Sequence, residues 1–161
     1  MTLGNLRIGQ GWDRHALVED ETLVLGGVAI DSELGTLGHS DGDVLVHAII
    51  DALLGAVGLG DIGERYPGTE RWKDASSLEM LSDTVGELDA LGWQLVNLDT
   101  SILCQSVALS SYRDRMSQRI RSIFNGNGPV HVKYKTADGF GPVGENKAID
   151  ASAVCLLSNM P

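Results

Sequence analysis

The chain has few basic residues, few aromatic residues, two cysteines and no long apolar run. It carries 12 Lys and Arg against 22 Asp and Glu, a formal net charge of -10. This balance argues against binding to nucleic acid or to an anionic lipid surface. No stretch reaches the roughly 20 apolar residues of a membrane span, and the opening MTLGNLRIG lacks the apolar core of a signal peptide. We therefore expect a soluble, cytoplasmic protein.

Cys104 and Cys155 each stand in an apolar stretch. Neither has the spacing of a metal or redox pair, so both are predicted to be small core residues in a reducing compartment. The 161 residues, of which 43% are hydrophobic, suffice for one core, and no repeat or linker divides them. We expect a single domain over residues 1–161.

Strand and helix patterns are interleaved along the chain. Strands are predicted at Leu6–Gly11, Thr22–Ile30, 93–106, 130–136 and 148–158, and helices at 44–57, Ser76–Leu91 and Tyr112–Phe124. The first two strands could pair through the loop between them, with the Gly pair at 26–27 as a bulge. Ser40 with Asp43, and Ser76 with Glu79, have capping-box spacing. The order predicts an α+β sandwich with a partly antiparallel sheet.

Asp13 and His15 stand two residues apart where the first predicted strand ends. Residues two apart on a strand point to the same face. If the next helix packs on that strand, His47, one turn from the helix start, can meet them. Two imidazoles and a carboxylate are the usual protein ligands of a catalytic zinc ion, which keeps its fourth position open. The alternative is that Asp13 caps a turn and His47 is a satisfied histidine on a helix face.

A glycine-rich segment, GLGDIG at 58–63, follows this helix. It can expose backbone N–H groups, and its Asp61 is an acceptor suited to a hydroxyl group. The loop before the helix supplies His39, Ser40 and Asp41. Taken alone, the glycine-rich segment is better explained as a plain helix stop.

A second glycine-rich loop, KYKTADGFGPVGENK, follows the strand at 130–136. It places Thr136 where it could touch an anion and Asp138 where it could bind a hard cation. Lys133 and Lys135 share one face of the strand. They are therefore either a solvated edge or the positive charge that an acidic protein needs for an anionic substrate.

Three stretches, DRH at 13–15, GHSDGDVLVHAIIDALLGAVGLGDIGE at 38–64 and KTADGFG at 135–141, carry a family resemblance. Together they resemble the 2-C-methyl-D-erythritol 2,4-cyclodiphosphate synthases of the non-mevalonate isoprenoid pathway. The resemblance covers nearly the whole chain in register, and its long central block is highly specific.

The resemblance implies a homotrimer of ferredoxin-like α+β subunits, each a two-layer sandwich with a mixed sheet, with active sites between neighbouring subunits. It implies a lyase that converts 4-diphosphocytidyl-2-C-methyl-D-erythritol 2-phosphate to the cyclodiphosphate and CMP. The 2-phosphate of the substrate attacks the β-phosphorus in line. Attack of one phosphate on another chiefly needs charge neutralisation and positioning.

The resemblance also assigns roles to residues. It implies that Asp13, His15 and His47 bind zinc, and that Asp138 binds magnesium or manganese. His39 and Thr136 would be the catalytic residues that hold the phosphates in the transition state. The implied substrate-binding residues are Asp13, His15, His39, Ser40, Asp61, Ile62, Gly63, Lys135, Thr136, Ala137, Asp138 and Phe140.

The chain departs from the family pattern in places. The cytidine-binding loop reads CQSVALSS at 104–111, without the family's Pro-Lys pair, and Gly68 replaces an acidic residue. Lys135 and Ala137 replace hydroxyl residues, and Glu145 stands where the family often has an Arg that binds isoprenoid diphosphates. In an active synthase Lys135 would partly replace the missing lysine.

Two other functions stay open from the sequence. One is a divergent, non-catalytic, zinc-binding trimeric paralogue that binds another phosphorylated ligand. The other is a zinc-dependent phosphohydrolase that uses the open metal position on water.

Overall fold

The computed structural model of the chain describes residues 6–73 and 75–159. The expectation that the opening MTLGNLRIG is not a signal peptide rests partly on residues 1–5, which lie outside the described residues. The strands are β1 (Leu6–Glu19), β2 (Leu23–Leu25), β3 (Val28–Ile30), β4 (Leu34–Leu37), β5 (Trp93–Leu103), β6 (Val130–Lys135) and β7 (Ala148–Asn159). The helices are α1 (Val44–Val57), α2 (Ile62–Arg65), α3 (Ser77–Ala90), α4 (Arg113–Ile123) and α5 (Gly141–Gly144), with a 3-10 turn, η2, at Glu70–Trp72.

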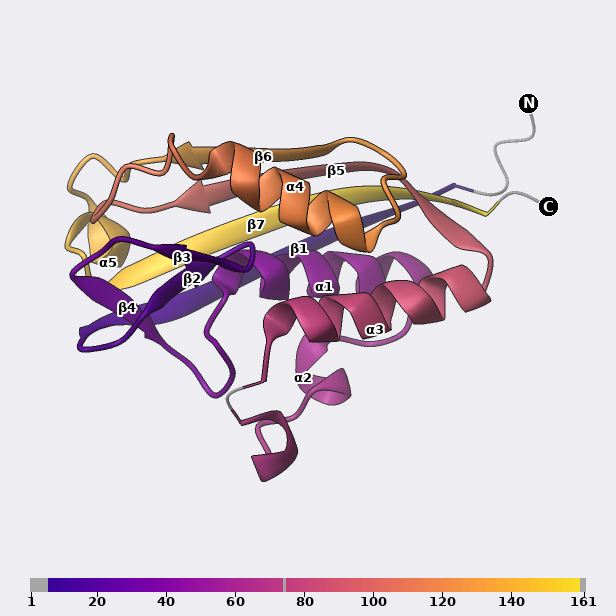
Figure 1. The fold of residues 1–161 in the computed structure, drawn as a ribbon, viewed down its shortest axis with the longest axis horizontal. Coiled ribbons are helices and arrows are strands. Elements are labelled where there is room, and N and C mark those ends of the chain that lie inside the picture. Colours follow the sequence, from indigo (N-terminus) through magenta and orange to yellow (C-terminus); the bar gives the residue numbers. More distant parts are fainter. Residues whose placement is uncertain (1–5, 74, 160–161) are drawn as a thin grey trace.

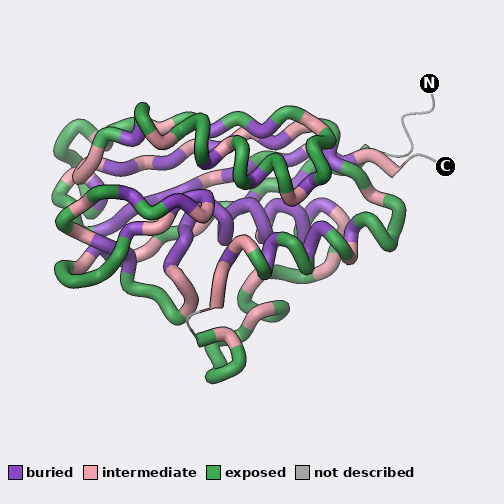
Figure 2. The backbone as a smooth tube through the Cα atoms, viewed as in Figure 1, coloured by how far each residue is buried: buried purple, intermediate pink, exposed green. Residues whose placement is uncertain are grey.

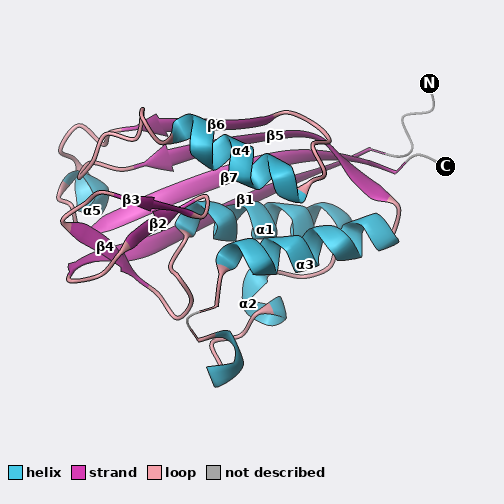
Figure 3. Cartoon of the chain, viewed as in Figure 1, coloured by secondary structure: helices cyan, strands magenta, loops and turns pink. Residues whose placement is uncertain are grey.

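Five strands form a mixed sheet in the order β4-β1-β7-β5-β6 (Figure 3). Neighbours pair antiparallel except β5 and β6, which run parallel. The parallel pair needs a crossover, and α4 supplies it. The C-terminal strand β7 lies in the middle of the sheet, so the last stretch of sequence completes the sheet as predicted. The α+β class with a mixed sheet is confirmed.

The segment Thr22–Ile30 is a hairpin, so the single strand predicted there, paired with the first strand, is wrong. β2 pairs antiparallel with β3, with Leu25 opposite Val28. Gly26 and Gly27 form the two-residue turn between them, with φ of 57° and 69°. A type I′ turn needs positive φ at both positions, which glycine adopts without strain. The Gly pair is therefore a turn and not a bulge.

Three helices of eleven or more residues pack on the sheet and on one another. α1 packs against β1 and β7, α4 against β6, and α3 against both α1 and α4 (Figure 1). α3 and α4 begin and end within one residue of their predicted bounds. Figure 2 shows that α1 is buried along most of its length. Within the described residues, no helix combines the length and apolarity needed to cross a membrane.

The two predicted capping boxes are wrong. Asp43 itself is the N-cap of α1, and its carboxylate accepts a hydrogen bond from Val46 N at 3.1 Å. Ser76 is the N-cap of α3 but makes no side-chain capping bond. The carboxylate of Asp41, from the loop before α1, accepts from Ser77 N at 2.9 Å instead. A charged acceptor makes the stronger bond to a backbone N–H, so aspartates serve both helix starts.

Two glycines of β1 let α1 lie directly on the sheet. A Cβ at Gly9 would stand 1.9 Å from Ala52 O, and one at Gly11 would stand 2.1 Å from Ala48 O. No side chain can occupy these distances, so only glycine permits this approach. The helix contributes alanines at the same contact. Helix and strand backbones therefore meet with almost no side chain between them.

The opposite face of the sheet exposes apolar residues. Ile8, Trp12 and Val154 are 72%, 53% and 40% exposed. They alternate along β1 and β7 with buried residues that face α1, as the period of two along a strand requires. A cluster of exposed large apolar side chains marks a surface for interaction.

Both cysteines are buried and free, as predicted. Burial raises the pKa of the Cys155 thiol to about 11. A thiol with a raised pKa carries little thiolate at neutral pH and is unreactive. The two side chains therefore serve the core.

The same change at two glycines tests the contact between β1 and α1. We expect Gly11→Ala to lower the free energy of unfolding by about 1–3 kcal/mol, because the new methyl group overpacks the interface. Gly55→Ala, on α1 with nothing within 4 Å of its Cβ position, should raise it by about 0.5–1 kcal/mol. Urea unfolding measures both. Equal effects would contradict the close approach.

Candidate active site

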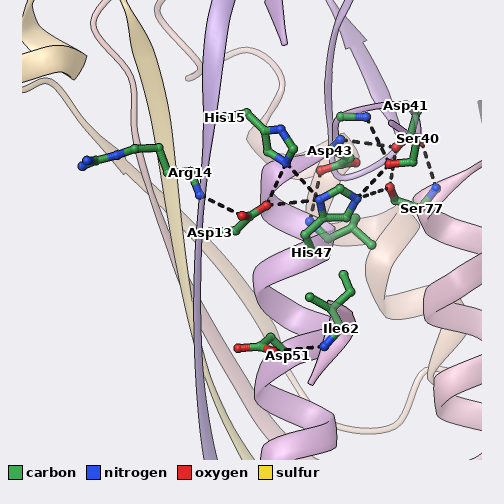
Figure 4. Close-up of polar contacts among 12 residues, drawn as sticks. Asp13, Arg14, His15, Ser40, Asp41, Asp43, His47, Asp51, Ile62 and Ser77 are labelled. Atoms are coloured by element: carbon green, nitrogen blue, oxygen red, sulfur yellow. Dashed lines mark hydrogen bonds and ion pairs between the residues drawn. The ribbon is translucent and has the colours of Figure 1, made fainter. Parts of the chain in front are cut away.

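Asp13, His15 and His47 meet beside the first turns of α1 (Figure 4). Asp13 Oδ2 lies 2.9 Å from His15 Nε2 and 3.1 Å from His47 Nδ1. The two imidazole nitrogens are 3.1 Å apart. Among the described residues, these three form the one group of metal-binding side chains whose donor atoms converge. The helix therefore packs on the strand, which is the condition under which the sequence allowed the three residues to meet.

The contact between β1 and α1 fixes this meeting. Gly9, Gly11, Asp13 and His15 alternate along β1 and so share the face that α1 covers. His47 directly precedes Ala48, whose carbonyl oxygen is the nearest atom to the Cβ position of Gly11. The register that lets the helix touch the strand at the glycines places His47 over Asp13 and His15.

The outer nitrogen of each imidazole is held by a hydrogen bond. His15 Nδ1 lies 3.0 Å from Leu37 O, and a carbonyl can only accept, so Nδ1 carries the proton there. His47 Nε2 lies 2.9 Å from Ser77 Oγ and 3.1 Å from Ser40 Oγ. Such outer contacts orient histidines that bind metals. The inner nitrogens are thereby directed to Asp13.

The contact between the Asp13 carboxylate and the imidazoles beside it shifts the pKa values of Asp13 and His15. Burial disfavours its charged form, but the hydrogen bonds and charges of His15 and His47 outweigh burial and hold the pKa of Asp13 below its ordinary value. Burial also disfavours a charge on His15, yet the Asp13 carboxylate raises the pKa of His15. The site is built to hold positive charge beside Asp13, as a proton or as a metal ion.

The donor set suits zinc. Tetrahedral ligands about 2.0–2.1 Å from zinc are separated from each other by about 3.3 Å. The three donor atoms here lie 2.9 to 3.1 Å apart, so an increase of a few tenths of an ångström would accommodate the ion. Three protein ligands leave a fourth position for a substrate oxygen. The residues present therefore fit the metal that the sequence suggested.

The three side chains open onto a pocket of about 230 Å³. Four predicted substrate residues line it with them, namely His39, Ser40, Ile62 and Gly63. His39 Nε2 donates to Thr69 O at 2.7 Å, which leaves Nδ1 available to a ligand. The sequence thus located the polar wall of the pocket.

Asp61 and Asp51 hold the segment that carries Ile62. Asp61 is the N-cap of α2, where its carboxylate accepts from Glu64 N at 2.8 Å. Asp51, one turn beyond His47 on α1, accepts from Ile62 N at 3.3 Å. The predicted hydroxyl acceptor Asp61 therefore also serves a helix start. Its carboxylate keeps lone pairs for a second donor.

Sequence reasoning missed the apolar wall of the pocket, formed by Tyr66, Trp72 and Met80. The Tyr66 and Trp72 rings meet edge to face with centroids 4.9 Å apart. The Tyr66 hydroxyl donates to Met80 O at 2.8 Å and so ties the segment to α3. The available signal was the placement of two aromatic residues in a chain with only 5% aromatics.

The predicted residues of the second glycine-rich loop gather elsewhere. Thr136 Oγ1 donates to Asp138 Oδ1 at 3.1 Å, and Phe140 is 81% exposed. Lys135 ends β6, and Ala137 N donates to Gln105 Oε1 at 3.2 Å. β7 and β5 lie between β1 and β6. Three strand spacings amount to roughly 14 Å, so the fold does not bring this loop to the metal-binding triad of the same chain.

The cytidine-loop segment and Glu145 lie with this second cluster. Gln105, in CQSVALSS, also accepts from Gly139 N at 3.4 Å, so its amide braces the loop around Asp138. Glu145 accepts from Lys147 Nζ at 2.7 Å, which neutralises part of its charge and lowers its pKa. Gln105 and Glu145 therefore each have a local polar partner in this cluster.

The fold and the triad define an α+β protein in which three side chains that can bind a metal ion converge. The chain matches the YgbB family model over residues 6–158. The 2-C-methyl-D-erythritol 2,4-cyclodiphosphate synthase of Thermotoga neapolitana is 49% identical over 157 residues, 98% of this chain and 94% of that protein. The Thermotoga maritima protein of the same name is 51% identical over 150 residues, 93% of this chain and 90% of that one.

Solved structures of relatives have the same fold as this chain. A CDP complex of IspF from Plasmodium falciparum superposes with a TM-score of 0.86 at 33% identity, covering 99% of this chain and 100% of that one. Bifunctional IspDF from Campylobacter jejuni gives a TM-score of 0.91 at 34% identity, covering 96% of this chain and 42% of that one. The chain belongs to the YgbB family, whose relatives carry the name 2-C-methyl-D-erythritol 2,4-cyclodiphosphate synthase.

The buried cap Asp43 gives a pH dependence. Burial raises its pKa to about 6, although Gly27 N donates to it at 2.7 Å. The folded chain then keeps a proton that the unfolded chain loses from about pH 4, so stability should fall as pH rises from about 4 to 6. Asp43→Asn cannot ionise and should lack this component in urea unfolding of metal-free protein. Parallel pH profiles of the two proteins would contradict the raised pKa.

Proposed function

We propose that this chain is an active phosphorus–oxygen lyase of isoprenoid biosynthesis. It converts 4-diphosphocytidyl-2-C-methyl-D-erythritol 2-phosphate to 2-C-methyl-D-erythritol 2,4-cyclodiphosphate and CMP. The observation that carries the proposal is the convergence of Asp13, His15 and His47 in the lining of one pocket. Relatives at 43% and 51% identity carry the name 2-C-methyl-D-erythritol 2,4-cyclodiphosphate synthase. The CDP complex of a structural neighbour supports a nucleotide-linked substrate.

The reaction joins two anionic groups. An oxygen of the 2-phosphate attacks the β-phosphorus, and the bond from that phosphorus to the CMP phosphate breaks. Repulsion between the groups is the main obstacle, so positioning and neutralisation supply the catalysis. Zinc held by Asp13, His15 and His47, and magnesium or manganese held by Asp138, would neutralise phosphate charge as Lewis acids.

The remaining residues orient the substrate. His39 and Thr136 would donate hydrogen bonds to the phosphates, with Ser40 beside His39. Asp61, Ile62 and Gly63 would bind the erythritol hydroxyls, because Ile62 and Gly63 line the pocket. Lys135 would face the diphosphate in place of the absent loop lysine, with Ala137 and Phe140 beside the nucleotide.

A homotrimer with shared active sites explains why one chain separates its two clusters. Two strands separate β1, which carries Asp13 and His15, from β6, which leads into the Thr136–Asp138 loop, yet the proposed reaction needs both clusters at one substrate. An assembly of ferredoxin-like subunits, each chain forming one domain, would bring the triad of one subunit to the loop of the next. Exposed Ile8, Trp12 and Val154 on the open sheet face support burial against copies of this chain.

Product analysis tests the function. With zinc and magnesium present, the wild-type chain should release CMP and the cyclodiphosphate from the named substrate. His47→Ala should bind no zinc and fall below about 1% of that rate, since a metal centre contributes several kcal/mol. His131→Ala, a change at an exposed histidine on β6, is the matched control.

Each outcome separates the candidate functions. Wild-type activity retained by His47→Ala would refute the role of the triad. A folded, zinc-loaded protein that makes no CMP would favour the non-catalytic paralogue. Release of inorganic phosphate without cyclisation would favour a phosphohydrolase.

Mixing two inactive variants tests the shared site. His47→Ala lacks the triad and Asp138→Asn lacks the loop carboxylate, so each alone should be nearly inactive. In a trimer that pairs the triad of one subunit with the loop of the next, random mixing restores about one quarter of the sites. Activity after co-refolding should therefore rise well above both parents. Mixed oligomers with no recovered activity would place both clusters in one subunit's site.

A further inference from the structure

His47 has a second, buried side that the proposed reaction does not use. Its Nε2 lies 2.9 Å from Ser77 Oγ, at the start of α3 (Figure 4). The Ser77 hydroxyl in turn donates to Asp41 Oδ1, and Ser77 N donates to Asp41 Oδ2 at 2.9 Å. Ser77 is fully buried. Asp41, Ser77 and His47 thus form a chain of hydrogen bonds behind the metal-binding triad.

The chemistry of these groups fixes where each proton lies. A carboxylate only accepts, so the single Ser77 hydroxyl proton is committed to Asp41. Ser77 Oγ can then only accept from His47, so Nε2 carries a proton. Asp13 Oδ2, 3.1 Å from Nδ1, also only accepts, so a metal ion that binds Nδ1 takes the place of a proton there, while Ser77 keeps the proton on Nε2. Nδ1 is the nitrogen that faces Asp13 and His15.

The second hydroxyl near Nε2 cannot set this direction. Ser40 Oγ lies 3.1 Å from Nε2 and 3.4 Å from Gly42 N, which donates to it. No carboxylate holds the Ser40 hydroxyl proton among the hydrogen bonds of the described residues. Ser40 can therefore donate or accept with either tautomer, whereas Ser77 can only accept.

The geometry points to Asp41 and Ser77 as positioning residues that fix the His47 tautomer in which Nδ1 can bind the metal. This assignment rests on the proposed zinc role of His47. Asp41 accepts the Ser77 hydroxyl proton, and Ser77 Oγ therefore accepts a hydrogen bond from His47 Nε2. The same carboxylate ties the loop before α1 to α3, a tie strengthened by Asp41 N donating to Ala75 O at 3.2 Å. The orientation of His47 therefore depends on the packing of α3 against α1.

Asp41→Asn is the sharpest variant, because it keeps the shape and reverses the polarity. The Asn amide oxygen can still accept from Ser77 N, while its NH₂ group faces Ser77 Oγ as a donor. The Ser77 hydroxyl must then donate to His47 Nε2, which moves the imidazole proton to Nδ1. Ser77→Ala removes the link, Ser77→Thr keeps the hydroxyl, and Ser76→Ala, one residue away with no capping bond, is the matched control.

Two measurements report the effect without any assay of turnover. ¹⁵N NMR of the imidazoles in protein loaded with zinc, which replaces the proton between His47 Nδ1 and Asp13, should find Nε2–H in the wild type and in Ser76→Ala. It should find Nδ1–H, with His47 released from the metal, in Asp41→Asn and a mixture in Ser77→Ala. Zinc affinity, by competition with a chromogenic chelator, should fall about 10–100-fold in Asp41→Asn and Ser77→Ala, and Ser77→Thr should restore most of it.

Circular dichroism and urea unfolding establish that each variant is folded before these comparisons. A folded Asp41→Asn or Ser77→Ala with the wild-type tautomer and wild-type zinc affinity would overturn the assignment. Weaker zinc binding with an unchanged tautomer would also overturn it, because the residues would then act only on structure. These readouts are independent of CMP release, so a wild-type chain with no synthase activity would refute the proposed function and leave the assignment standing.

Discussion

The contact between α1 and the two glycines of β1 is the constraint on which the site depends. A side chain at Gly9 or Gly11 would hold the helix away from the strand, and His47 would move away from Asp13 and His15 with it. Interiors are packed too densely to absorb such a shift elsewhere. The close packing of α1 on β1 therefore sets the distances between the donor atoms of Asp13, His15 and His47.

The charges around Asp13 are arranged within a chain whose formal net charge is -10. The site places an anionic Asp13 between two imidazoles, and the hydrogen bonds on their outer nitrogens keep the inner nitrogens available. The proposed metal ion would supply positive charge locally, where a phosphate needs it, without a basic surface over the whole molecule. The pocket joins this polar centre to an apolar wall, so it suits a ligand with phosphates at one end and carbon atoms at the other.

The sequence predicted what depends on short-range pattern. The period of two put Asp13 and His15 on one face, and the helical stripe with its glycine stop placed α1, so the triad could be anticipated. The hairpin at Gly26–Gly27 was missed, because a bulge and a two-residue turn use the same residues until the pairing partner is known. The partner of His47 on α3, Ser77, lies 30 residues away. No spacing rule reports such a contact, which arises only from the packing of α3 on α1.

A crystal structure of the zinc-loaded protein, with anomalous diffraction data collected on both sides of the zinc absorption edge, tests the account most directly. The account predicts one strong anomalous peak about 2.0–2.2 Å from Asp13 Oδ2, His15 Nε2 and His47 Nδ1. A zinc ion bound through His47 Nε2, or no peak among these three atoms in a protein that holds zinc in solution, would contradict it.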